Sequence, residues 1–235
     1  MSTPQSLARL GSVSGVVGAV LLFVSTLLHP LDSDPNDLSA AFAEYAADSL
    51  WVWSHLGQFV GVAMIGVALI ALATTLEAGR AAAWGRVGLA GAVAIIGVAA
   101  ALQAVGGVAL KVAVDRWAAA TGEVRALAFE AAFAVRQIEV GLASLLSLLS
   151  GVTVAVFGVS ILLSTRYPSW VGGIGLLDGL GLAAAGAEQA STGFSEVAMV
   201  LSMLASSVLI LWVILVGILL WRLAPQLADG RAAAE

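Results

Sequence analysis

Long apolar stretches alternate with short polar segments along the whole chain. The apolar stretches cover approximately 11–29, 56–76, 87–110, 140–163, 169–187 and 197–221. A helix needs about 20 apolar residues to cross the hydrocarbon core of a bilayer, whereas a barrel strand is about half as long and alternates in polarity. These stretches are apolar on every face. The pattern therefore predicts an all-α integral membrane protein with six transmembrane helices in a single domain, 1–235.

Two segments outside the spans have helical periodicity but are too polar to cross a membrane. In 36–50 the apolar side chains recur at helical spacing, with Phe42 and Tyr45 among them and Glu44 off that face. Such a helix is expected to lie on the outer membrane surface with its aromatic side chains directed inward. The segment 123–136 is expected to extend the fourth span outward as an amphipathic helix. Both would cover the outer mouth of the helical bundle.

Composition agrees with a chain that is surrounded by lipid. Hydrophobic residues make up 60% of the sequence and charged residues 11%, and the mean hydropathy is +1.02. Because about a quarter of the residues in a soluble domain are charged, most of this surface is expected to contact membrane lipids. The chain has no cysteine, which excludes disulfides and thiolate metal sites. Its net charge of −5 and the lack of a basic run argue against a nucleic-acid partner.

The positions of the arginines predict the orientation. One side of a six-span arrangement would carry Arg9, Arg80, Arg86, Arg166, Arg222 and Arg231. The other side would carry many acids, including Asp32, Asp34 and Asp37. Since arginine-rich loops face the cytoplasm, we predict a plasma-membrane protein with both termini cytoplasmic and 224–235 as a cytoplasmic tail. The first apolar stretch is long for a signal peptide and is expected to be an uncleaved anchor.

Asp178 is the one charged residue deep inside a predicted span. It lies about 12 Å along the helix from Trp170, which is near the bilayer midplane. A carboxylate is costly there, so we expect the group to be protonated or paired. One interpretation is a polar clasp between close-packed helices, with serines of the fourth and sixth spans and the neighbouring glycines. The other is a membrane-buried acid that exchanges a proton with a ligand.

His29 and His55 are the only histidines, and both are predicted near the outer boundary of consecutive antiparallel helices. Two imidazoles at one depth can ligate a haem or a metal ion, or hold the polar end of a ligand. A haem would require the two helices to stand apart, and no tight ligand spacing supports a metal site. Histidines at the interface without a special role remain the alternative.

A third polar group is predicted at the outer interface, in the segment 136–139. Arg136 and Glu139 are three residues apart on a helix and can form an ion pair, which is the structural alternative to a site. Together with other polar residues at similar predicted depth, they would line an outer vestibule with Asp178 as its floor. The candidate ligand-binding residues are His29, Gln58, Gln103, Arg136, Gln137 and Glu188, and the candidate catalytic residues are Asp178, Glu139 and His55.

Several short motifs resemble a broad family of uncharacterised six-helix membrane proteins of actinobacteria and haloarchaea. The motifs are Leu28-His29-Pro30, Ser54-His55-Leu56, Tyr167-Pro168-Ser169-Trp170 and Gly193-Phe194-Ser195. The resemblance extends over most of the chain and implies six spans and an interest in both histidines. It implies no reaction.

Three functions are compatible with these residues. The first is an intramembrane terpenoid or prenyl-lipid cyclase or isomerase, in which Asp178 protonates a lipophilic small molecule and Glu139 or His55 stabilises or deprotonates the cation. Such an enzyme needs no cofactor. The second is a b-type haem electron carrier with His29 and His55 as axial ligands. The third is a transporter or an accessory subunit without catalysis. A homo-oligomer and a larger membrane complex are both compatible with the sequence.

Overall fold

The computed structural model describes residues 2–30, 32–76 and 79–228, and all regular structure in this part of the chain is helical. The helices are α1 (Thr3–Leu27), α2 (Leu38–Ala47), α3 (Trp51–Thr75), α4 (Gly79–Gln103), the π-helix η1 (Ala104–Ala109), α5 (Leu110–Ala119), α6 (Gly122–Leu162), α7 (Ser169–Thr192) and α8 (Glu196–Ala228). Six helical stretches are long and apolar enough to cross a membrane, and α4, η1 and α5 together form one of them. The prediction of an all-helical chain with six apolar spans is confirmed, and the fold is that of a multi-pass membrane protein.

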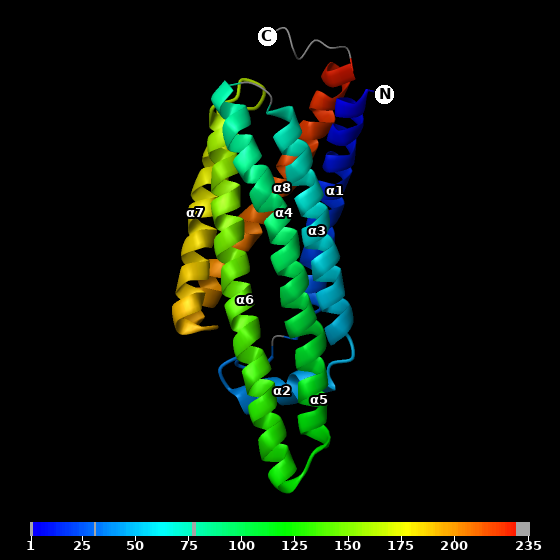
Figure 1. The fold of residues 1–235 in the computed structure, drawn as a ribbon, viewed down its shortest axis with the longest axis vertical. Coiled ribbons are helices and arrows are strands. Elements are labelled where there is room, and N and C mark those ends of the chain that lie inside the picture. Colours follow the sequence, from blue (N-terminus) through cyan, green and yellow to red (C-terminus); the bar gives the residue numbers. More distant parts are fainter. Residues whose placement is uncertain (1, 31, 77–78, 229–235) are drawn as a thin grey trace.

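The six long helices form a closed ring. In order, α1 packs against α3, α3 against α4, α4 against α6, α6 against α7 and α7 against α8, and α8 returns to α1. Figure 1 shows both termini at one end of this ring, and α2 lies across the opposite end, which we call the far end. At the terminal end the Ser2 hydroxyl donates to the carbonyl oxygen of Leu227 at 3.2 Å. The side of the membrane on which the termini lie stays a prediction.

Helices α6 and α7 pack closely along their length, and glycines make the close approach possible. A Cβ atom on Gly179 would lie 2.5 Å from the carbonyl oxygen of Gly151, and one on Gly172 would lie 2.7 Å from that of Gly158. Two turns beyond Gly179 on α7, a Cβ atom on Gly186 would lie 2.7 Å from the carbonyl oxygen of Ser144. Small residues of this kind allow helix backbones to touch where no hydrophobic force brings them together within lipid.

The helices extend further than the apolar stretches that predicted them. Helix α6 begins at Gly122, so the predicted amphipathic extension 123–136 is continuous with the fourth span. Helix α8 continues to Ala228 and takes in the first residues of the predicted tail. The rest of that tail, with Arg231, lies outside the described residues. Hydropathy falls where charged residues begin, but the backbone hydrogen bonds of a helix continue past them.

The helix predicted over 36–50 is present as α2, and it closes the far end of the ring. Phe42 and Tyr45 are buried and pack against Trp117 and the other apolar side chains of α5 and α6 in this layer. The Lys111 ammonium donates to the carbonyl oxygens of Tyr45 and Ala46, at 3.1 and 2.7 Å, at the C-terminal end of α2. A cation at the last carbonyls of a helix stabilises that end. The cap fixes α2 over the mouth of the bundle.

Candidate functional site

A cavity of about 440 Å³ lies beneath α2 at the far end of the ring. All six long helices contribute to its walls, together with α2 and the loops that follow α1 and α7. Met203, on α8, lines the cavity and is 69% exposed, so the cavity reaches the surface of the bundle beside this helix. Met203 is about two turns inside α8, at a depth of about 10 Å from the helix end. The cavity therefore extends from the polar far end into the apolar part of the bundle.

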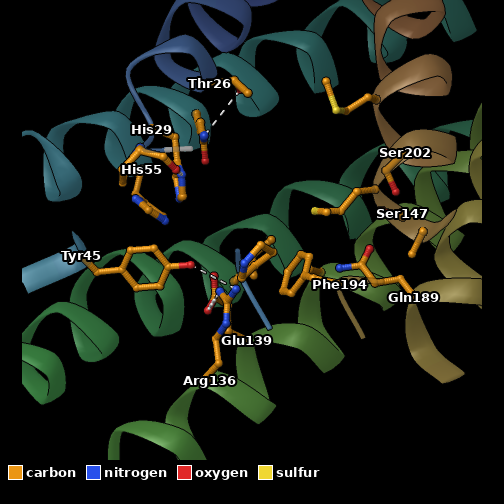
Figure 2. Close-up of a pocket in the computed structure, with 18 of the residues that line it drawn as sticks. Thr26, His29, Tyr45, His55, Arg136, Glu139, Ser147, Gln189, Phe194 and Ser202 are labelled. Atoms are coloured by element: carbon orange, nitrogen blue, oxygen red, sulfur yellow. Dashed lines mark hydrogen bonds and ion pairs between the residues drawn. The ribbon is translucent and has the colours of Figure 1, made fainter. Parts of the chain in front are cut away.

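Most of the polar residues predicted to converge do line this cavity. The structure brings together His29, His55, Gln58, Gln103, Arg136 and Glu139. They come from the end of α1 and from α3, α4 and α6, which are neighbours in the ring. Figure 2 shows the two histidines facing Arg136 and Glu139 across the polar part of the cavity, with Tyr45 beside the ion pair. Their functional roles stay predictions.

Three predicted residues do not line the cavity. Gln137 is exposed on the other face of α6. Glu188 does not line the cavity, but its neighbour Gln189 does, and Gln189 is 4% exposed. Asp178 is buried on α7 but is also absent from the wall, and it lies about 16 Å along the helix from Gln189. Its Oδ2 atom has no hydrogen-bond partner among the described residues, so no serine clasp forms at this oxygen.

Four aromatic rings pack together beside the cavity, and three of them, Tyr45, His29 and His55, line it. Tyr45 and Trp51 have ring centroids 4.3 Å apart, Trp51 and His55 4.5 Å, and Trp51 and His29 4.8 Å. The two imidazoles are 5.1 Å apart. The indole Nε1 of Trp51 donates to the carbonyl oxygen of Gly106 at 3.0 Å, which fixes the central ring. The histidines are therefore held in place by packing as well as by hydrogen bonds.

The π-helix η1 brings its backbone against these rings. A Cβ atom on Gly107 would lie 2.5 Å from the Cβ of His55, and one on Gly106 would lie 2.9 Å from Oε1 of Glu139. A Cβ atom at Gly107 would collide with His55, and one at Gly106 would displace the Glu139 side chain. A π-turn widens a helix locally and is frequent at functional sites. Here the widened turn at Ala104–Ala109 brings the backbone of its glycines against both the histidine and the carboxylate.

Arg136 and Glu139 form a buried ion pair at the polar side of the cavity. Arg136 Nη1 lies 2.7 Å from Glu139 Oε2, and Arg136 Nη2 donates to the Tyr45 hydroxyl at 3.3 Å. The guanidinium also lies 4.5 Å from the ring centroid of Phe194. Burial raises the pKa of Tyr45, so its hydroxyl stays protonated at neutral pH. The pair leaves no net charge at this side of the cavity.

Polar contacts hold the loops around the cavity. The carboxylate of Glu44 accepts the backbone N–H groups of Asp32 and Ser33, at 3.0 and 2.9 Å. Slight burial would raise the pKa of Glu44, but hydrogen bonds from Ser33 and Asp32 outweigh it and lower the pKa below its usual value. Asn36 donates to the carbonyl oxygen of Phe194 at 3.1 Å, which joins the loop after α1 to the loop after α7. These contacts connect the segments that cover His29 and Phe194.

A haem held by both histidines would require the two imidazoles to stand further apart than they do in this structure. Two metal–nitrogen bonds of about 2 Å each would separate the ligating nitrogens by about 4 Å, and the ring centroids lie further apart again. The observed centroid distance of 5.1 Å, with planes at 51°, is too short for this arrangement. Within the described residues no three histidine or acidic side chains gather as metal ligands. The haem-carrier hypothesis stays a prediction.

Several residues of the cavity carried weak sequence signals. The apolar wall includes Ala143, Met199 and Met203, which were indistinguishable from other lipid-facing residues of the spans. The consecutive glycines at 106 and 107, one turn after Gln103, were the signal that could have indicated a close backbone approach. Phe194 belongs to one of the motifs noted in the sequence, but nothing there indicated its contact with Arg136.

Comparison of the chain with protein-family models, with curated proteins and with solved structures gave no match. The family resemblance of the short motifs therefore stays a prediction.

Proposed function

We propose that the protein binds a lipophilic small molecule with one polar end in the far-end cavity. The observation that supports this most strongly is that one cavity has a polar wall and an apolar wall. One wall carries the histidines, the glutamines and the ion pair, and the other carries Ala198, Met199 and Met203 of α8. A mostly apolar cavity with a few converging polar groups is the usual form of a small-molecule site.

Two unsatisfied polar atoms support the presence of a ligand. Oε1 of Gln103 and Oγ of Ser202 are buried and have no hydrogen-bond partner among the described residues. Both side chains line the cavity. Since a buried polar group without a partner costs about 1–3 kcal/mol, a molecule that bonds to it is stabilised there. The exposure of Met203 offers a route for such a molecule from the surrounding lipid.

Catalysis is a separate step in this proposal. The cyclase hypothesis needs an acid at the ligand, and Asp178 lies outside the cavity wall. Glu139 is at the cavity but is already paired with Arg136. These contacts favour binding over proton transfer. Replacing Asp178 with Asn is therefore expected to leave the bound ligand in place.

Mass spectrometry of lipid extracts tests the proposal. The protein is purified gently and compared with Ser202→Phe, whose ring would fill the cavity, and with Leu204→Phe, whose ring would lie on the opposite, exposed face of the same helix. We expect one lipophilic species to be enriched with the wild-type protein and with Leu204→Phe and to be lost with Ser202→Phe. An absorption spectrum of the same samples tests for haem.

Two outcomes contradict the proposal. One is a wild-type extract that contains only bulk membrane lipids in their ordinary proportions. The other is a species that is retained equally by Ser202→Phe. A Soret band that disappears with His55→Ala would instead favour the haem carrier.

A further inference from the structure

The hydrogen bonds of the two histidines define which of their nitrogens face the cavity as acceptors. Nδ1 of His29 lies 2.9 Å from the carbonyl oxygen of Pro30, and Nδ1 of His55 lies 2.7 Å from that of Trp51. A carbonyl oxygen can only accept, so each Nδ1 carries the proton and donates it. In a neutral imidazole the other nitrogen, Nε2, is then an acceptor. No described residue donates to either Nε2 atom, and both side chains line the cavity.

A chain of hydrogen bonds leads to a third acceptor. The Thr26 hydroxyl donates to the carbonyl oxygen of Leu22 at 2.8 Å, so it accepts from the Gln58 amide nitrogen at 3.5 Å. The Gln58 oxygen consequently faces Gln103, whose Nε2 donates to it at 3.2 Å. These donors and acceptors determine which end of each glutamine amide is the oxygen and which is the nitrogen. Oε1 of Gln103 is the atom that remains, and it has no donor.

The cavity offers no free positive charge to an anion. Its cation is Arg136, and Glu139 lies 2.7 Å from the guanidinium with both side chains more than nine-tenths buried. Tyr45 and Phe194 cover the guanidinium faces at 5.5 and 4.5 Å. A carboxylate or phosphate group would add an unpaired charge to this neutral pair and would lose its own hydration.

From these contacts we infer that the cavity selects a ligand whose polar end is a hydroxyl group, a long-chain or prenyl alcohol. The inference rests on the proposed function and names the chemical class of its ligand. A hydroxyl donates one hydrogen bond and accepts others, so it can bond to an Nε2 atom or to Gln103 Oε1 and still accept a bond. An ether and a carboxylate only accept, and they would leave all three acceptors without a donor.

Burial also lowers the pKa of the His29 imidazole, which keeps the ring neutral and its Nε2 an acceptor at neutral pH. The charged groups around this ring are Glu139 and Arg136 of α6, Glu44 of α2 and Asp48 after α2. The carboxylates oppose the effect of burial, and burial is the larger influence.

The test uses four ligands that share one apolar chain. Radiolabelled hexadecanol is incubated with the purified full-length protein in detergent, and unlabelled hexadecanol, hexadecyl methyl ether, hexadecanoate and hexadecylamine are added as competitors. One hydrogen bond contributes enough for about a tenfold preference, so we expect hexadecanol to compete about tenfold better than the ether and better than both charged ligands. Equal competition by the ether, or tighter binding of hexadecanoate or hexadecylamine, overturns the inference and leaves the proposed function intact. If labelled hexadecanol binds equally to Ser202→Phe, the proposed function fails as well.

Variants identify the atoms that recognise the hydroxyl. Gln103→Met and His29→Phe each remove one acceptor while keeping a side chain of similar size, and Gln137→Met is the control on the exposed face of α6. We expect the preference for the alcohol over the ether to fall about threefold or more in at least one of the first two variants and to stay unchanged in the control. Retention of the full preference in both variants, each eluting as a folded protein, overturns the assignment.

Discussion

Neutralising Glu139 tests whether the buried ion pair is coupled as the structure indicates. Glu139→Gln keeps the shape of the side chain but leaves the Arg136 guanidinium without its counter-charge 2.7 Å away. Leaving one member of a buried pair uncompensated typically costs about 3 kcal/mol or more. For a chain of this length the loss corresponds to a decrease in Tm of about 6–12 °C. Glu130→Gln, at an exposed position on the same helix, is expected to change Tm by no more than about 1 °C.

A double-mutant cycle gives the coupling between the two charges. Arg136→Met alone removes the bonds to Glu139 and to the Tyr45 hydroxyl and leaves a buried carboxylate. Combining it with Glu139→Gln removes both charges, so the double variant should be more stable than the sum of the two single losses by about 2 kcal/mol. Thermal unfolding in one detergent, followed by tryptophan fluorescence, measures all four proteins. Strictly additive losses, or a Glu139→Gln variant as stable as Glu130→Gln, would refute the reasoning.

Three further predictions concern other parts of the site. Gly107→Ala places a Cβ 2.5 Å from the Cβ of His55 and should lower Tm by several degrees. The control Gly97→Ala has open space around the added Cβ and should leave Tm unchanged or slightly raised. Equal Tm values for the two variants would contradict the close approach at Gly107. Burial lowers the pKa of His29 below 6.5, so as pH falls through 6.5 this imidazole binds a proton in the unfolded chain before it does so in the folded protein. The contribution of His29 to the free energy of unfolding should therefore be constant above this pH and decrease below it. His29→Gln should flatten that decrease in a Tm series from pH 8 to pH 5, and an unchanged slope would assign it to another group. Asp178→Leu replaces a buried carboxyl whose Oδ2 has no partner and should raise Tm, so a lower Tm would reveal a contact that this carboxyl makes.

The sequence predicted the depth of each polar residue along its helix, but it did not predict the rotation of each helix about its own axis. Apolar length alone predicted the six spans, because a chain with so few charges has no other way to cover its surface than with lipid. It also predicted that the histidines and glutamines near the span ends reach one level. Successive residues on a helix differ by about 100° in direction, however, and spans that are apolar on every face carry no signal for that angle. This is why Gln189 lines the cavity while Glu188 does not, and why Arg136 and Glu139 face inward while Gln137 is exposed.

The sequence by itself determined the class of protein and the chemical groups that are available at the far end. Only the tertiary structure decided which of them meet, because the ring closes through contacts between α8 and α1 and the cavity exists only once it is closed. The separation of Asp178 from the cavity is also a tertiary result. The glycine-rich packing of α6 on α7 fixes the rotation of α7 and thereby directs Gln189, about three turns beyond that acid, into the site.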